Sequence, residues 1–98
     1  MNVVTEYKIK ADQVGAQKAA LIEFAAQLKQ LNNPDIKFTA YHLHDGVSFK
    51  HVTYLKDDAT AGLLMSQEFY KTLGEGTSER CEAEPNFSPM DMVATFKV

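Results

Sequence analysis

The three histidines of this 98-residue chain lie close together near its middle, at positions 42, 44 and 51. Asp45-Gly46 stands between them, and this dipeptide is a strong signal for a two-residue turn that joins two antiparallel strands. Such a turn places Ala40 opposite His51, and residues two apart on a strand share a face. The spacing therefore predicts that His42, His44 and His51 project from one face of one hairpin.

Three imidazoles on one face can bind zinc when a fourth coordination position is open. A ligand histidine is usually oriented by a hydrogen-bond partner such as a carboxylate, and no acidic residue is expected beside these rings. We therefore expect no bound metal and interpret His42, His44 and His51 as a solvated or interface-lining face. Imidazoles titrate near an ordinary pKa of about 6.5, so acid is expected to weaken whatever this face contacts, including a partner subunit.

Other side chains with chemical potential are fewer. The tyrosines are Tyr7, Tyr41, Tyr54 and Tyr70. A phenol can polarise a carbonyl or donate a proton to an oxygenated intermediate, although strand aromatics more often belong to a core or an interface. Cys81 lacks the surroundings of a catalytic thiol and is interpreted as a small buried hydrophobe. Arg80 lies among glutamates and is interpreted as a solvated, ion-paired residue on a helix face.

Composition indicates one small globular domain, residues 1–98, and argues against several classes of function. The net charge of −3 and a pI near 5.5 do not suit nucleic acid, which attracts basic surfaces. No apolar run approaches the length of a membrane span, and the strand-like start leaves no room for a signal peptide. A single cysteine provides neither an internal disulfide nor a thiolate metal site. We expect a cytoplasmic protein without nucleic-acid or membrane partners.

Hydrophobic periodicity outlines the elements that must position these residues. Alternation predicts a strand over residues 1–10, and a stripe of apolar residues predicts a helix that Asp12 caps and that ends near Leu31. After the hairpin, Asp57-Asp58 opens a second helical region with a restart at Ser66 as a fresh cap. Gly74 and Gly76 predict either a break there or a close packing contact. The remainder is a turn-rich connector at Glu84–Pro89 and a final strand at Met90–Val98.

The resulting order, β-α-β-β-α-β, predicts an α+β fold of the ferredoxin-like type, a four-stranded antiparallel sheet with two helices on one face. Phe24 and Leu28 on the first helix and Phe69 on the second are expected to pack on the sheet as core. Helices can cover only one face, and the other face also carries apolar residues. An uncovered apolar face usually marks a partner surface, so we expect a homodimer.

Local motifs in three elements also carry a family likeness. They are Val4-Thr5-Glu6-Tyr7, Asp45-Gly46-Val47-Ser48-Phe49-Lys50-His51-Val52, and Ser66-Gln67-Glu68-Phe69 with Arg80-Cys81. With these motifs the chain resembles, over its whole length, the dimeric α+β barrel superfamily, which contains antibiotic-biosynthesis monooxygenase-like domains. The resemblance implies that two sheets face each other between subunits and that each protomer holds a small-molecule pocket between helices and sheet. Members of the group differ widely in activity.

The chain departs from the haem-degrading members of that group. Leu73 occupies the position where those enzymes carry an axial histidine. The chain has no tryptophan, and Tyr54 or Leu55 stands in the region where those enzymes place one. An asparagine that several members use on the first strand has no counterpart, since Thr5 and Tyr7 stand there. These departures argue against haem degradation, and they also remove the residues best known for cofactor-free oxygenation in the family. We expect no cofactor.

The family pocket opens on the first strand, so the resemblance favours Tyr7 as a ligand contact. We name Tyr7, Phe24, Tyr54 and Phe69 as candidate ligand contacts and Tyr7 and His51 as candidate catalytic residues. Three functions stay open. The first is a domain that binds a small organic molecule and acts as a cofactor-free, monooxygenase-like enzyme. The second is a non-catalytic binding or structural homodimer whose pocket is filled by side chains. The third is a metal-dependent protein that uses the three histidines. Whether the chain is an enzyme is not decided by its residues.

Overall fold

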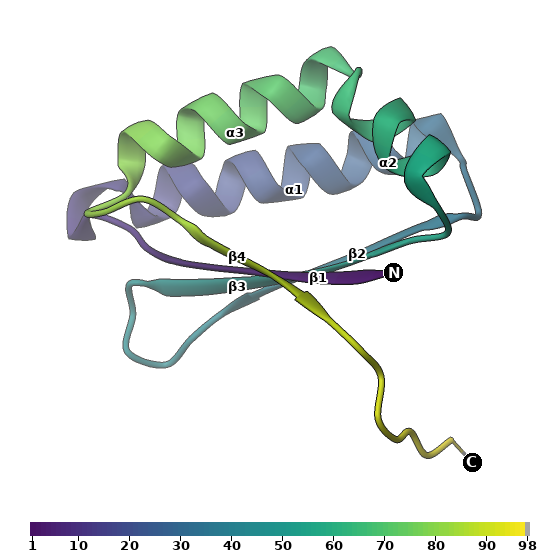
Figure 1. Cartoon of the computed structure of the whole chain (residues 1–98). Helices are drawn as coiled ribbons and strands as arrows, with labels where there is room; N and C mark the ends of the chain where they lie inside the picture. The colour runs from purple at the N-terminus through teal and green to yellow at the C-terminus, as the bar shows by residue number, and fades with distance from the viewer. Residues whose placement is uncertain (98) are drawn as a thin grey trace.

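The computed structural model describes residues 1–97 and follows the predicted element order, with the second helical region divided in two (Figure 1). The elements are β1 (Asn2–Lys8), the 3-10 turn η1 (Ala11–Gln13), α1 (Val14–Leu31), β2 (Ile36–His42), β3 (Ser48–Leu55), α2 (Asp58–Met65), α3 (Glu68–Arg80) and β4 (Asn86–Met90). Within residues 1–97, no helix combines the length and the apolar character that a membrane crossing would need.

The strands form one antiparallel sheet in the order β2-β3-β1-β4, and the helices cover one of its faces (Figure 1). The predicted α+β, ferredoxin-like fold is therefore confirmed. Strand β1 lies inside the sheet, with β3 on one side and β4 on the other. Its odd-numbered residues face the helices and its even-numbered residues face away, because side chains alternate along a strand.

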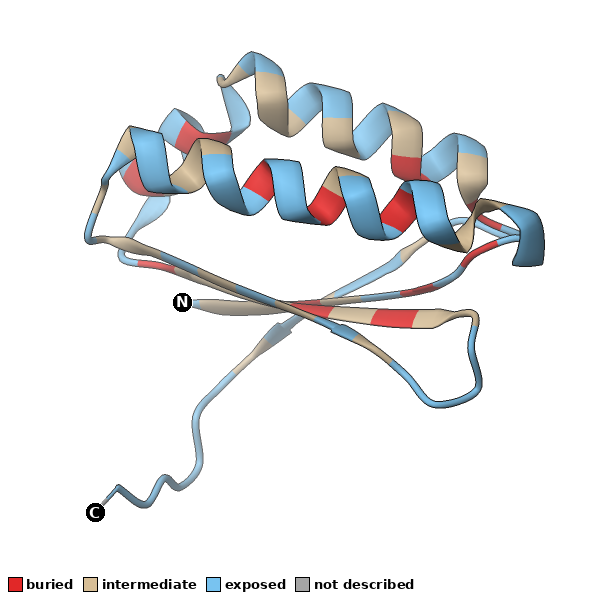
Figure 2. Cartoon of the chain, turned by 180° about the vertical axis from the view of Figure 1, so that it is seen from behind, coloured by how far each residue is buried: buried red, intermediate tan, exposed pale blue. Residues whose placement is uncertain are grey.

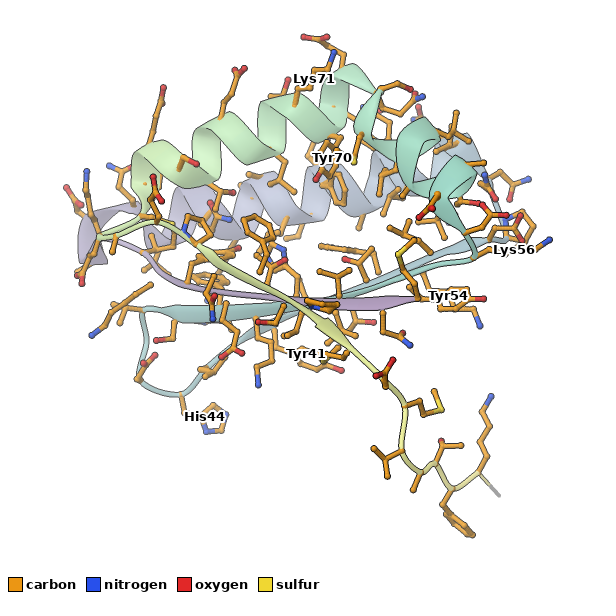
Figure 3. All side chains as sticks on the ribbon, in the orientation of Figure 1. Tyr41, His44, Tyr54, Lys56, Tyr70 and Lys71 are labelled. Carbon is orange, nitrogen blue, oxygen red and sulfur yellow. The ribbon has the colours of Figure 1, made fainter. Side chains whose placement is uncertain are left out.

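The register of the hairpin is the predicted one, with His42 opposite Phe49 and Ala40 opposite His51. His42 and His51 accordingly share a face, and it is the face that the helices cover. His44 lies beyond the end of β2, in the loop, and its ring points away from the rest of the protein at the hairpin tip (Figure 3). The prediction that all three imidazoles share one face is therefore wrong for His44, because it applied strand alternation to a loop residue.

The hairpin loop is longer than the two residues predicted, but it preserves the register. The last backbone pair before the loop is Leu43 N–H to Ser48 O at 2.9 Å, so four residues connect the strands. Gly46 has a φ of 87°, which residues with a side chain rarely adopt. An oxygen of Asp45 accepts hydrogen bonds from the N–H groups of Val47 and Ser48 at 3.0 and 2.8 Å. Asp45-Gly46 thus directs the turn as expected, within a wider loop.

The first helix ends as the sequence predicts but begins differently. Asn32 adopts a left-handed conformation, with a φ of 52°, and its N–H bonds to Leu28 O, which ends α1 just before Pro34. At the other end, Asp12 lies in the η1 turn and no side chain caps the helix, so the expected Asp12 cap is not present.

The second helical region begins at the predicted cap. Asp57 accepts a hydrogen bond from Thr60 N–H at 2.8 Å. The chain restarts as α3 after residue 67, with Gln67 rather than Ser66 in the capping position. Helix α3 then runs unbroken through Gly74 and Gly76, so the alternative of a glycine break is wrong.

The last strand lies four residues earlier than predicted. Residues 86–90, assigned to a connector because of their prolines, form β4, whereas residues 91–97 have no regular structure and Val98 lies outside the described residues. Strand β4 is at the sheet edge, where Pro89 pairs with Val3. A proline lacks an N–H but is tolerated on an edge strand, since that side need not bond to a neighbour.

Figure 2 marks buried positions in red on both the helices and the strands. Val4 is buried on the uncovered face of the sheet, whereas the other buried hydrophobic residues lie between the sheet and the helices and form two groups. The first cluster contains Tyr7, Ile9, Leu21, Phe49 and Cys81. The second cluster contains Phe24, Leu55 and Leu64. Phe38 and Leu73 pack against both. Leu28 and Phe69 pack against the second cluster, so the three predicted core residues belong to the core.

Candidate functional site

A cavity of about 510 Å³ lies between the covered face of the sheet and the helices, within the size range of small-molecule sites. Its walls are largely apolar. The sheet contributes Val3, Thr5, Tyr7, Phe38, His51, Thr53 and Leu55; the helices contribute mainly Phe24, Leu28, Leu64, Tyr70, Leu73 and Thr77. The positions from β1 and β3 are all odd-numbered, so strand alternation brings them to one surface.

A group of hydrogen-bonded polar side chains, the polar cluster, forms one part of this site. It consists of Tyr7, Gln17, His51, Thr77 and Arg80. Tyr7 Oη is hydrogen-bonded to His51 Nε2. Gln17 Nε2 donates to Tyr7 Oη at 2.7 Å and to Thr77 Oγ1 at 3.0 Å, and Arg80 Nε donates to Gln17 Oε1 at 2.8 Å. These hydrogen bonds connect β1 and β3 of the sheet with the helices α1 and α3 inside an apolar core.

Burial decides the charge state of the Tyr7–His51 pair. Tyr7 and His51 are 7% and 6% exposed, and Gln17 is fully buried. Burial raises the pKa of Tyr7 well above its usual value, a change that the hydrogen bond from Gln17 opposes, and it lowers the pKa of His51 to about 4. Both groups are therefore neutral at pH 7. A neutral phenol–imidazole pair can hold a proton at a defined atom and form a hydrogen bond to a ligand oxygen.

The structure brings together some of the residues that the sequence nominated for ligand contact. Tyr7 and Phe24 line the cavity, as does His51. Phe69 does not line it, because its ring packs behind Phe24 with centroids 5.5 Å apart. Tyr54 is on the opposite face of the sheet, since it is an even-numbered residue of β3, and Lys37 Nζ lies 5.6 Å from its ring centroid. Tyr54 and Phe69 are thus not among the residues that line this cavity.

The histidines are dispersed rather than gathered. His51 is buried at the cavity, whereas His42 stacks on Phe49 with ring centroids 4.7 Å apart and hydrogen-bonds Gly46 O at 2.9 Å. His44 is exposed. Among the residues that the structure describes, no three side chains of His, Cys, Asp or Glu are placed to share a metal ion. The geometry that the metal hypothesis required is therefore not formed.

Sequence reasoning missed three members of the polar cluster. The burial of Gln17 could have been predicted from the sequence. Val14 and Leu21 belong to the apolar stripe of α1, and Gln17 occupies the position between them on the same face. Thr77 follows Leu73 by one turn in the same way. Arg80 was assigned to solvent and to neighbouring glutamates, but it bonds to Gln17 instead. Cys81 is buried in the first cluster, as predicted.

Gly76 accounts for the position of Arg80. A Cβ atom at position 76 would lie 2.9 Å from Arg80 Nη2 and 3.0 Å from Nη1. The predicted close packing contact is therefore present at Gly76. At Gly74, a Cβ atom would meet no atom within 4 Å, and this residue lines the cavity.

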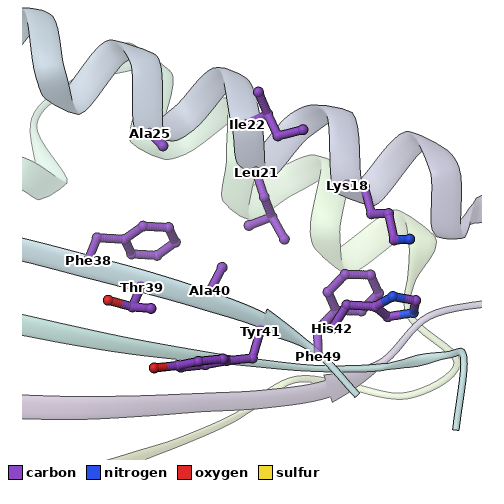
Figure 4. A pocket seen from close by; sticks show the side chains of 10 residues that line it. All are labelled: Lys18, Leu21, Ile22, Ala25, Phe38, Thr39, Ala40, Tyr41, His42 and Phe49. Carbon is purple, nitrogen blue, oxygen red and sulfur yellow. The ribbon is translucent and has the colours of Figure 1, made fainter. Parts of the chain in front are cut away.

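A second, more open groove of about 480 Å³ runs between α1 and the edge strand β2 (Figure 4). Leu21, Ile22 and Ala25 form its helix side, and Phe38 to His42 form its strand side. Lys18 and His42 lie at one end. Neither Lys18 nor His42 belongs to a hydrogen-bonded network like the polar cluster, so the less open cavity between the sheet and the helices is the stronger candidate site.

Comparison with known proteins gives a consistent answer for the fold. No protein-family model matches the chain, and no curated protein matches it. Solved structures do match. An antibiotic biosynthesis monooxygenase superposes with a TM-score of 0.82 at 14% identity, covering 95% of this chain and 98% of that one. A putative antibiotic biosynthesis monooxygenase from Nitrosomonas europaea gives 0.81 at 15% identity, with 94% and 88% covered.

A cofactor-independent oxygenase from Streptomyces nogalater also matches, with a TM-score of 0.71 at 11% identity and 94% and 93% of the two chains covered. At such identities the comparison establishes fold and not activity. The resemblance predicted from the sequence is confirmed at this level: the chain has the α+β fold of antibiotic biosynthesis monooxygenase-like structures.

Proposed function

We propose that the protein binds a small organic molecule in the cavity between the sheet and the helices and acts on it as a cofactor-free, monooxygenase-like enzyme. The observation that carries this proposal is a cavity of about 510 Å³ with apolar walls and a buried Tyr7–His51 pair among its lining residues. Apolar walls favour a flat, largely apolar ligand, and the pair offers a hydrogen bond to an oxygen atom of that ligand. The cavity beside Tyr7 argues against the alternative of a pocket filled by side chains.

The substrate class that fits is an activated phenol. A hydrogen bond from the site to the phenol oxygen favours the phenolate, the electron-rich form that reacts with dioxygen. With a free para carbon, the phenol and one O₂ molecule give a quinone and one water molecule. The substrate supplies all four electrons that O₂ needs in this balance. The reaction therefore requires the protein to bind, orient and polarise the substrate, which the chain's own residues can do.

Replacing Tyr7 with phenylalanine tests this proposal, because the change removes only the hydroxyl that holds His51. We expect kcat/KM for oxygen uptake with 1-naphthol to fall about 100-fold, the lower range for a residue that orients an acid–base group. Tyr54→Phe is the matched control, since Tyr54 lies on the opposite face, and it should keep the wild-type rate. Calorimetric binding of 1-naphthol without oxygen uptake in the wild type would instead support a non-catalytic binding protein.

We also propose that the functional unit is a homodimer built on the uncovered face of the sheet. Val4 and Val52 lie at the centre of this face, and Tyr41 projects from it with 54% of its surface exposed (Figure 3). The tail after β4 adds Met92, Val93 and Phe96, which are 69%, 96% and 86% exposed. Apolar exposure on this scale favours a partner, and a stable contact should bury more than about 1,000 Å².

Light scattering at micromolar concentration is expected to give about twice the 10.9 kDa of one chain. Tyr41→Glu should shift the mass towards the monomer, because it places a charge in the proposed contact. Leu63→Glu, which changes a residue of α2 with 41% exposure, is the matched control and should leave the dimer intact. A wild-type mass near that of one chain would refute the dimer.

A further inference from the structure

Arg80 decides the orientation of the Gln17 side-chain amide. A guanidinium has only donors, so the atom of Gln17 that faces Arg80 Nε, 2.8 Å away, must be the carbonyl oxygen Oε1. The opposite orientation would set two donors against each other in a fully buried position. Both N–H bonds of Gln17 Nε2 are then directed to Tyr7 Oη and Thr77 Oγ1.

The amide orientation fixes the direction of the next hydrogen bond. Tyr7 Oη accepts a hydrogen from Gln17 Nε2, which cannot accept one in return. The only other atom bonded to Tyr7 Oη is His51 Nε2, so the buried hydroxyl hydrogen is paired only if it goes to Nε2. A neutral imidazole carries one hydrogen, on one of its two nitrogens. Since Nε2 accepts from Tyr7, the hydrogen of His51 is on Nδ1.

Nδ1 of His51 is available to a ligand. Within residues 1–97, this nitrogen has no hydrogen-bond partner. Every fully buried side-chain nitrogen or oxygen in that part of the chain does have a partner, so Nδ1 is not one of the fully buried atoms. Nδ1 is therefore not sealed in the core, and His51 is one of the residues that line the cavity. The N–H group that results from the chain of hydrogen bonds is accessible from the cavity.

Gly76 supplies an independent observation on Arg80. Glycine is a poor helix former, but here it leaves the space over which the Arg80 guanidinium lies back along α3, where a Cβ atom would come within 2.9 Å of Nη2. Neither Arg80 nor Gln17 lines the cavity, so both act from behind it.

We infer that Arg80 is a positioning residue that sets, through Gln17 and Tyr7, the Nδ1–H tautomer of His51, and that the site consequently selects molecules with an acceptor oxygen, such as a carbonyl or a phenolate. This inference rests on the proposed binding function and names the chemistry that binding requires. A ligand that placed a hydrogen-bond donor at this position would face the Nδ1–H donor of His51, and neither donor would have an acceptor.

Nitrogen-15 NMR of the imidazole rings at pH 8 tests the positioning role without any ligand. The wild-type protein should show His51 with a protonated Nδ1 and an unprotonated Nε2. Gln17→Glu should reverse the tautomer, because a carboxylate accepts from both Arg80 and Tyr7, and Tyr7 Oη then accepts from His51 Nε2–H.

Arg80→Met should give a mixture of the two tautomers, since nothing then fixes the Gln17 amide. Arg80→Lys, which restores a group with donors only, should return the ring to the Nδ1–H form. An unchanged tautomer in both Gln17→Glu and Arg80→Met, or an Nε2–H ring in the wild type, would overturn the role of Arg80.

Binding of a matched pair of probes tests the selection. 1-Tetralone and tetralin share a bicyclic skeleton and differ by one carbonyl oxygen. Calorimetry should show that the wild type binds 1-tetralone about tenfold more tightly, the gain from one hydrogen bond. Gln17→Glu should reduce this preference below about twofold while the affinity for tetralin stays unchanged.

The two proposals fail in different ways. If neither probe binds to the wild type, the proposed binding function is wrong, and the NMR experiment still decides the role of Arg80. If both probes bind equally while His51 is in the Nδ1–H form, the cavity binds ligands but the inferred selection is wrong.

Discussion

Truncation of Phe24 to alanine is expected to lower the free energy of unfolding by about 3–5 kcal/mol. Phe24 is 4% exposed, and its ring centroid lies 4.9 Å from that of Phe38 and 5.5 Å from that of Phe69. The loss should be large because the space vacated by the ring joins an existing cavity, so the surrounding side chains cannot close over it. Urea unfolding at one fixed protein concentration measures the effect, since a dimer's stability depends on concentration.

Ile22→Ala is the matched control for this truncation. Ile22 is on the same helix, but 72% of its surface is exposed, and its replacement should change stability by no more than about 0.5 kcal/mol. A loss below about 1 kcal/mol for Phe24→Ala would mean that the ring contributes little to the core and serves only to line the cavity.

Acidification from pH 7 to pH 4 is expected to cost roughly 3 kcal/mol of stability through His51 alone. Burial lowers the pKa of His51 from 6.5 to about 4, so between these values the unfolded chain binds a proton that the folded chain does not. The free energy of unfolding therefore falls as the pH decreases from 6.5 to about 4. Above pH 6.5 the protein keeps the whole contribution of His51 to its stability. Below the window, carboxyl groups take over, because hydrogen bonds led by that from Ser48 lower the pKa of Asp45 to about 2.

His51→Gln should remove most of this pH dependence, because glutamine keeps an acceptor for Tyr7 but does not titrate. His44→Gln, which changes an exposed ring in the hairpin loop, should behave like the wild type. Thermal unfolding curves recorded from pH 7 to pH 4 on the three proteins measure the difference. An equal slope for His51→Gln and the wild type would show that His51 is protonated as easily in the folded as in the unfolded protein.

This acid effect differs from the one expected from the sequence, which interpreted the histidines as a solvated or interface-lining face and expected acid to weaken whatever that face contacts. Alternation along β2 and β3 correctly put His42 and His51 on one face. Which face the helices cover could not be read from the hairpin alone, because both faces carry aromatic residues. The structure places His51 under the helices, where protonation opposes folding and has no direct bearing on the proposed dimer contact.

Hydrophobic periodicity predicted correctly those elements in which the pattern of buried residues and the intrinsic propensity of the residues indicate the same secondary structure. The first strand, the helix ending at Leu31 and the hairpin register are of this kind. It failed for β4, where Pro89 suggested a turn and only the edge position of the strand makes proline acceptable. Residues 91–97 alternate like a strand, but within the described part of the chain they pair with no other strand.

The site was harder to predict because its members depend on contacts between distant elements. Tyr7 and His51 stood out as aromatic and titratable residues. Gln17 and Arg80 are 63 positions apart, and each looks like a surface residue until α1 and α3 are packed together. Tyr54 was misplaced for a simpler reason, since its position one residue from Leu55 turns it to the other face.

The division of the core into two clusters has a consequence for how the protein opens. The cavity is lined by residues of both clusters, while Phe38 and Leu73 are the side chains that pack against both. Phe38 and Leu73 thus join the end of the molecule that holds Leu55 and Leu64 to the end that holds Ile9. We expect the amide hydrogens of the two ends to exchange at different rates in the free protein. A molecule bound in the cavity would touch both clusters, and we expect it to bring the two exchange rates closer together.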